Sequence, residues 1–174
     1  FVYIGSDHQW QCINEMFSLF KVIQNIYPSA RLNIYTEQKG SFSELVSKYN
    51  LNNVSVDTKF GSELSEDLKS IQYGFLIRKD HIVNYVATPT KISNYLASQI
   101  TPVITNNTSL SKLLCQQGAI VVPYEMISSD PSIESFVTSR LNLNNNHDIE
   151  WFIDCMSEIY IKKVSSLNLT TCCY

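Results

Sequence analysis

Short apolar segments that alternate with helical patterns limit what this chain can fold into more than any other feature of its sequence. Six such segments occur, at residues 1–4, 32–35, 54–56, 74–77, 103–105 and 119–122. The stretches between them carry apolar residues at helical spacing, and the connections are short. This alternation predicts an α/β fold, a Rossmann-like parallel sheet of six strands that is flanked by helices.

The first predicted helix follows the first strand directly. Ser6 and Gln9 stand three residues apart, as in a capping box, and Trp10 begins the apolar face of the pattern. Further helices are predicted at residues 41–49, 62–71 (with Ser62 as the cap), 90–97, 110–117 and 133–141, and a longer one at 148–164. The strand–helix alternation stops after Pro123, so the last two helices lie outside it.

The composition is that of an ordinary soluble globular protein. The 174 residues are 44% hydrophobic and 17% charged, which predicts one domain with a sizeable core over residues 1–174. The net charge of −3 argues against a nucleic-acid partner. No apolar run approaches the ~20 residues of a membrane span, no signal-peptide pattern is present, and the five cysteines form no Cys-x-x-Cys pair. We therefore expect a cytoplasmic protein with reduced thiols.

The carboxyl ends of the predicted strands are where an open parallel sheet binds its ligands. The first of these ends, Gly5-Ser6, holds a single glycine, so the Gly-x-Gly-x-x-Gly fingerprint of dinucleotide sites is absent. A Walker loop and a Gly-x-Ser-x-Gly elbow are absent too. His81 and His147 lack paired ligands at metal spacing, so we expect no metal and no cofactor.

The predicted helix start at Thr90 carries the strongest sign of ligand chemistry. Pro89 ends the preceding segment, Thr90 can cap the helix, and Lys91 adds a full charge to the first turn. A helix terminus of this kind attracts phosphate. The plainer interpretation, with Thr90 only a cap and Lys91 solvated, stays open because caps are far commoner than phosphate sites.

A family resemblance favours the phosphate interpretation. The run Lys91-Ile-Ser-Asn-Tyr-Leu-Ala, followed by Pro102-Val-Ile, resembles the nucleotide-sugar signature of retaining glycosyltransferases with the GT-B fold, the group 1 family. That signature has Lys, two residues, Glu-Tyr, a turn of small residues and then Pro-Val-Ile. The resemblance extends from Phe1 to about Tyr124 and implies the C-terminal, nucleotide-sugar-binding domain of such an enzyme.

The resemblance also implies a reaction and a set of partners. Enzymes of this family transfer a sugar from a nucleoside diphosphate to a glycan or lipid-linked acceptor, often in the synthesis of surface polysaccharides. The chain begins with Phe1 inside a strand, so we expect a fragment that lacks the N-terminal acceptor domain and is inactive alone. The nucleotide sugar would be a substrate, and peripheral membrane contact is an expectation for the full protein only.

The implied donor contacts fall into three groups, while no catalytic residue is assigned. The resemblance assigns the diphosphate to Gly5, Ser6, Arg78, Thr88, Pro89, Thr90 and Lys91, the base to Lys59 and Phe60, and the ribose to Asn94. Glycine and serine would let the backbone approach the phosphates, the two cations would offset their charge, and the helix start would present N–H groups.

Several family residues are absent. Asn94 stands where the family has a glutamate, Gln99 replaces a common glycine, and the Arg and Lys expected soon after the first strand are missing. These departures keep a second hypothesis open, a degenerate glycosyltransferase-like domain that binds a partner chain or a ligand without catalysis. A third, a nucleotide- or sugar-phosphate-binding Rossmann enzyme outside the family, is favoured less by the residues.

Overall fold

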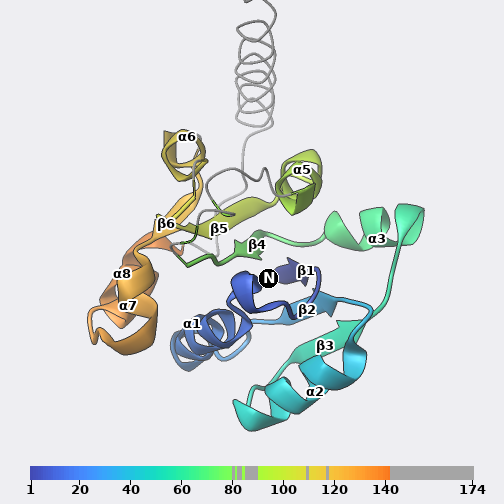
Figure 1. Ribbon diagram of the computed structural model, residues 1–174, viewed down its shortest axis with the longest axis horizontal. Coiled ribbons are helices and arrows are strands. Elements are labelled where there is room, and N and C mark those ends of the chain that lie inside the picture. Colours follow the sequence, from blue (N-terminus) through green and yellow to red (C-terminus); the bar gives the residue numbers. More distant parts are fainter. Residues whose placement is uncertain (80, 82–83, 85–89, 109, 117, 142–174) are drawn as a thin grey trace, which may run out of the picture.

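A six-stranded sheet forms the centre of the molecule (Figure 1). The computed structural model describes residues 1–79, 81, 84, 90–108, 110–116 and 118–141. The strands are β1 (Val2–Ile4), β2 (Leu32–Tyr35), β3 (Val54–Asp57), β4 (Tyr73–Leu76), β5 (Thr101–Thr105) and β6 (Ile120–Val122). Every pairing is parallel, which confirms the predicted fold class.

The strand order places β1 and β4 at the middle of the sheet. The order is β3-β2-β1-β4-β5-β6, so the chain moves outward from β1 in one direction and then returns to build the other half. The connections after β1 and after β4 therefore leave the sheet on opposite sides of the same point. A crevice at such a point, beyond the carboxyl ends of the strands, is where open α/β sheets bind ligands.

Helices cover both faces of the sheet (Figure 1). One face carries α1 (Ile13–Ile26), α2 (Lys39–Lys48), α7 (Tyr124–Ser129) and α8 (Ile133–Arg140), and the other carries α3 (Gly61–Leu68), α5 (Thr90–Ala97) and α6 (Ser111–Gln116). The short helix α7 was not predicted from the sequence. The predicted helix over residues 148–164 lies outside the described residues, and no helix in the described part is long and apolar enough to cross a membrane.

Two apolar cores result from the alternation of side chains along the strands. Phe1 and Tyr3 point to the core under α1, whereas Val2 points to the core under α5. Because successive residues of a strand face opposite sides, every strand except the edge strand β3 contributes to both cores. Each fully buried large side chain contributes roughly 1.5–3 kcal/mol to the free energy of unfolding.

The start of the first helix differs from the prediction. Residues Gln9–Gln11 form a short 3-10 turn, and α1 begins only at Ile13, after Cys12 has taken the left-handed φ of 51°. Neither turn nor helix has a side-chain cap, so the predicted Ser6–Gln9 capping box is wrong. Trp10 is 43% exposed and does not open an apolar face.

Two further local predictions meet different outcomes. The residue that precedes α3 is Phe60, so Ser62 lies inside this helix and the prediction that it caps the helix is wrong. At the end of α5, Gln99 takes a φ of 58°, the left-handed conformation for which the resembling family uses glycine. The Ile100 N–H bonds to the Tyr95 carbonyl at 2.8 Å and closes the turn. The turn therefore forms without glycine, at the conformational cost of a side chain in this region.

Close packing of α5 on β4 leaves no room for a side chain at Gly74, which can be tested by substitution. A β-carbon at this position would lie 2.7 Å from ring carbons of Tyr95, which is fully buried and donates a hydrogen bond to the Phe75 carbonyl at 3.0 Å. We expect Gly74→Ala to lower the free energy of unfolding by about 1–3 kcal/mol, measured by urea denaturation.

Gly40 provides the matched control for this substitution. It lies in α2, and a β-carbon there would meet nothing within 4 Å. Gly40→Ala should leave stability unchanged or raise it by up to about 1 kcal/mol, because glycine is a poor helix former. Equal effects of the two substitutions would contradict the packing described for Gly74.

Candidate functional site

Two cations meet at the point where β1 and β4 end. Arg78 follows β4 by two residues, and Lys91 belongs to the first turn of α5. A hydroxyl of β5 fixes the backbone of Arg78 from both sides. The backbone N–H of Arg78 donates to Thr105 Oγ1 at 2.9 Å, and the Thr105 hydroxyl donates to the backbone carbonyl of Arg78 at 2.6 Å. The position of Arg78 is therefore set by the sheet itself rather than by a loop.

The two cationic side chains converge on one oxygen, the Oε1 of Gln11. Lys91 Nζ donates to it at 2.8 Å, and Arg78 Nη1 donates to it as well. The hydroxyl oxygen of Tyr3 lies 3.2 Å from the same oxygen, but its single proton makes the shorter bond, at 2.6 Å, to the Ser6 carbonyl. Arg78 Nη1 also donates to the carbonyl of Trp10 at 3.3 Å. The cluster thus joins β1, the 3-10 turn, the end of β4 and α5.

Both cations are buried, and neither forms a salt bridge with a carboxylate among the described residues. Arg78 is 6% exposed and Lys91 is 7% exposed. The salt bridges in the described part of the chain involve other lysines only, namely Lys39, Lys59 and Lys69. Burial, together with the charge of Arg78, lowers the pKa of Lys91 well below its ordinary value of 10.5. The interpretation of Lys91 as a solvated surface residue is therefore wrong.

Gly5 makes room for the Lys91 ammonium. It has a φ of +139°, which side-chain-bearing residues rarely adopt, and a β-carbon on it would lie 3.0 Å from Lys91 Nζ. The ammonium also lies 4.2 Å from the centre of the Tyr3 ring, at cation–π distance. Tyr3 is held in turn by a 2.6 Å hydrogen bond to the Ser6 carbonyl. The glycine after β1 is thus required by a cation that comes from α5.

A cavity of about 240 Å³ opens beside this cluster, at the carboxyl ends of β1, β2 and β3. Gly5 and Ser6 form one side of it, and Lys59 and Phe60 form another. Phe60 is 65% exposed, which is unusual for a large apolar side chain. Hydroxyl and amide groups from Thr36 and Gln38, among others, line the remainder. Apolar walls with a few polar groups are typical of small-molecule sites.

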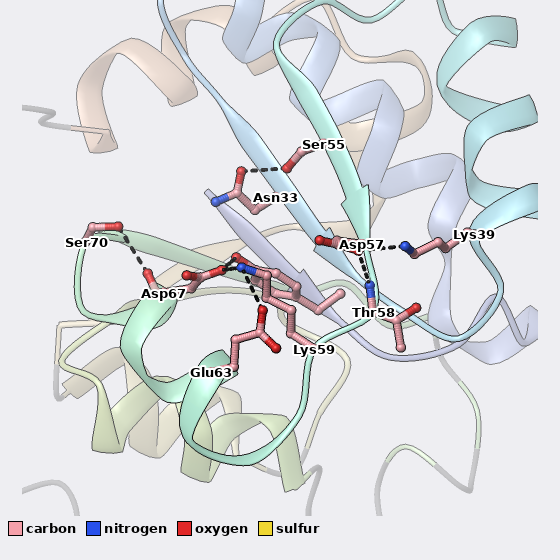
Figure 2. A network of polar contacts seen from close by, with 10 residues as sticks. Asn33, Lys39, Ser55, Asp57, Thr58, Lys59, Glu63, Asp67 and Ser70 are labelled. Carbon is pink, nitrogen blue, oxygen red and sulfur yellow. Dashed lines mark hydrogen bonds and ion pairs between the residues drawn. The ribbon is translucent and has the colours of Figure 1, made fainter.

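Figure 2 shows that the Lys59 ammonium is turned toward α3. It lies 2.6 Å from Asp67 Oδ2 and 3.5 Å from Glu63 Oε1. The hydrogen bond between Lys59 and Asp67 raises the pKa of the lysine and lowers that of the carboxyl. Burial, followed by a hydrogen bond to the same Asp67, raises the pKa of Tyr35 to about 12. The charge of Lys59 is therefore largely offset within the protein.

The structure gathers part of the predicted site and leaves part of it outside. Gly5, Arg78 and Lys91 lie together, while Lys59 and Phe60 share the cavity with Gly5 and Ser6. Thr90 and Asn94 are exposed on α5, and Thr88 and Pro89 lie outside the described residues. The described part of the chain holds no cluster of metal-ligating side chains. The roles of these residues toward a donor stay predictions.

Sequence reasoning missed Gln11 and Tyr3, which complete the cluster. Gln11 was placed on the body of a continuous helix, where nothing distinguishes it from a surface residue. The one available signal was its position in the polar run that follows the first strand, at the edge of the sheet where ligands bind. Tyr3 was assigned to a strand core, and the role of its hydroxyl was not foreseen.

Comparison with solved structures places this fold among glycosyltransferases. AviGT4, a glycosyltransferase involved in avilamycin A biosynthesis, matches with a TM-score of 0.66 and 14% identity, over 95% of this chain and 50% of its own. A trehalose-6-phosphate structure from E. coli, bound with UDP-2-fluoro glucose, matches with a TM-score of 0.61 and 12% identity, over 91% of this chain and 40% of its own. The chain thus spans half or less of the length of each of these two proteins.

The C-terminal domain of a glycosyl transferase group 1 family protein (LpcC) from Francisella tularensis matches with a TM-score of 0.53 and 11% identity. The match covers 80% of this chain and 84% of that domain. No family model matches the sequence, and no curated protein matches it either. The resemblance to the C-terminal half of GT-B glycosyltransferases is therefore confirmed at the level of the fold.

The burial of Lys91 predicts a substitution that stabilises the protein. Lys91→Met keeps the apolar stem and removes a buried charge that has no carboxylate partner in the part of the chain that the structure describes. We expect the free energy of unfolding to rise by about 1–3 kcal/mol at pH 7, as measured by urea denaturation. Lys112→Met, at an exposed position of α6, should change it by less than about 0.5 kcal/mol.

The gain from Lys91→Met should also depend on pH. The pKa of Lys91 is lower in the folded than in the unfolded state, so the unfolded protein binds more protons between that pKa and 10.5. The native lysine therefore destabilises least at high pH, and the advantage of Lys91→Met should shrink as pH rises toward 10. A gain that is constant from pH 6 to pH 10 would contradict this assignment.

Proposed function

We propose that this chain is the donor-binding half of a glycosyltransferase, and that it binds a nucleoside diphosphate sugar at the carboxyl edge of the sheet. The observation that carries the proposal is the pair of buried cations, Arg78 and Lys91. Neither has a carboxylate as a salt-bridge partner in the described part of the chain. Two adjacent cations of this kind are suited to the two negative phosphates of such a donor. Their position at the switch point of the sheet supports the same conclusion.

The same two cations have a direct use in sugar transfer. When the bond between the sugar and the diphosphate breaks, negative charge accumulates on the leaving phosphate. Guanidinium and ammonium groups held in place beforehand stabilise this charge without having to reorganise. The low exposure of Arg78 and Lys91 strengthens the effect, because electrostatic interactions weaken in water.

The cavity beside the cluster suits the nucleoside. Gly5 and Ser6 line it and also adjoin the cation cluster, so one ligand can extend from one region into the other. The exposed ring of Phe60 can stack on a base, and the hydroxyls and amides of Thr36 and Gln38 can bond to ribose. Lys59 forms part of the wall, with its charge already paired.

The rest of the reaction would need a further domain. In this proposal an N-terminal domain of the same protein binds the acceptor, a glycan or a lipid-linked sugar, so the chain alone binds the donor and transfers nothing. The synthesis of surface polysaccharide is the setting that we propose. The exposed Asn94, in place of the family's glutamate, supports the second candidate, a domain that binds the donor without catalysis. Turnover by the full-length protein separates the two.

Titration with UDP, GDP and ADP tests the donor site. We expect saturable binding of one of them by calorimetry, and a rise in the melting temperature, because a ligand of the folded state stabilises it. Arg78→Gln and Lys91→Met should each weaken binding by about tenfold or more, the equivalent of one hydrogen bond to a charged group. Lys112→Gln, which changes an exposed lysine, should leave the affinity unchanged.

Pyrophosphate and Phe60→Ala separate the two halves of the site. Pyrophosphate has no base, so Phe60→Ala should weaken nucleoside diphosphate binding and leave pyrophosphate binding as it is. Denaturation curves of each variant establish that it is folded. Failure of all three nucleotides to bind, to this chain and to the full-length protein, would overturn the proposed function.

A further inference from the structure

The side chain of Gln11 stands where a ligand of the cation pair would have to bind. Its Oε1 accepts from Arg78 Nη1 and from Lys91 Nζ at 2.8 Å, and the Tyr3 hydroxyl oxygen lies 3.2 Å away. A carbonyl oxygen has two lone pairs, so the two cations use the full acceptor capacity of the amide oxygen. Two cationic donors, one from the end of β4 and one from α5, thus point at one oxygen, which indicates a position suited to an anionic oxygen.

The Gln11 amide also carries too little negative charge to neutralise the two cations that surround it. The amide of Gln11 is neutral, whereas the groups that donate to it include a guanidinium and an ammonium that are both almost fully buried. A carboxylate or phosphate oxygen at the same point would offset their charge and accept more hydrogen bonds. Gln11 therefore satisfies the donors of the cations in part, and their charge has no counterion among the described residues.

The short turn η1 (Gln9–Gln11) holds Gln11 in this position. The Gln11 N–H bonds to the His8 carbonyl at 2.8 Å, and the left-handed Cys12 ends the turn before α1 begins. The turn contacts the cluster through the Trp10 carbonyl, which accepts from Arg78 Nη1, and through the long side chain of Gln11. A rotation about its side-chain bonds would clear the position without any change in the fold.

Access to the cations depends on this side chain. Arg78 and Lys91 do not line the cavity at the ends of β1, β2 and β3, although Gly5 next to them does. Gln11 itself is half-buried, so it connects the cluster with the surface. A ligand oxygen can contact both cations only if the Gln11 amide moves away.

We propose that Gln11 is an internal, neutral stand-in for an anionic oxygen of the ligand, and that the diphosphate group displaces it on binding. Gln11 is thus a positioning residue that holds the two cationic side chains on one point while the site is free. Gln11 also makes the site selective for anions, because a neutral or weakly basic group cannot compete with the amide oxygen for the two cations. The proposal rests on the proposed function only in taking the ligand to be a diphosphate.

Two substitutions of Gln11 should act in opposite directions. Gln11→Glu places a permanent carboxylate beside Arg78 and Lys91, so it should raise the melting temperature and weaken the binding of inorganic pyrophosphate by at least about tenfold. Gln11→Ala removes the internal competitor, so it should lower the melting temperature, and pyrophosphate should bind as tightly as before or up to about tenfold more tightly. Calorimetry and thermal unfolding of the full chain measure both quantities.

The pattern of signs distinguishes this role from a merely structural one. A structural hydrogen bond at Gln11 predicts that both variants lose stability and that anion affinity follows stability. Tight pyrophosphate binding by Gln11→Glu, or loss of binding in folded Gln11→Ala, would overturn the proposal. If pyrophosphate behaves as expected and no nucleotide binds, the stand-in role of Gln11 holds and the nucleotide-sugar function fails. If a nucleotide binds Gln11→Glu as well as the native chain, the function holds and this inference fails.

Discussion

Two positive charges lie side by side in the interior at the middle of the sheet's carboxyl edge, and the residues around them are arranged to make this tolerable. Burial of a charged group without a counterion costs on the order of several kcal/mol. Gly5 gives the Lys91 ammonium space, the Tyr3 ring faces it at 4.2 Å, and Gln11 accepts from both cations. These contacts lower the cost, and the two apolar cores on either side of the sheet offset what remains.

The topology of the sheet is what brings the two charges together. Because β1 and β4 are neighbours although the chain between them is long, Gly5 and Arg78 end up at the same edge. The hydroxyl of Thr105 then ties Arg78 to the adjacent strand β5, and α5 packs against the same pair of strands and delivers Lys91 (Figure 1). A sheet of this order thus produces a concentrated positive charge from residues that are far apart in sequence.

The sequence was sufficient to predict the strands but not to predict which side chains meet in the cation cluster. All six strands were predicted to within two residues at either end, because short apolar runs and short connections are local properties. The helix that begins at Thr90 and carries Lys91 was predicted as well, since its pattern is local too. The capping box at Ser6 was wrong because the left-handed Cys12 delays the helix, and nothing in the local pattern signals that conformation. Gln11 was missed because its partners Arg78 and Lys91 lie more than sixty residues away.

The most direct test of this account is the titration of Lys91 itself. In protein labelled with carbon-13 at the lysine ε-carbons, nuclear magnetic resonance follows the chemical shift of each ε-carbon as pH changes. The signal of Lys91 is the one that is missing from the spectrum of Lys91→Met. The account predicts a pKa well below 10.5 in the free protein, because the group is buried beside Arg78. Saturation with whichever of UDP, GDP and ADP binds most tightly should raise that pKa, because a nearby negative charge favours the protonated form. An ordinary pKa in the free protein, or one that the bound nucleotide leaves unchanged, would contradict the claim that this buried pair is a site for a diphosphate.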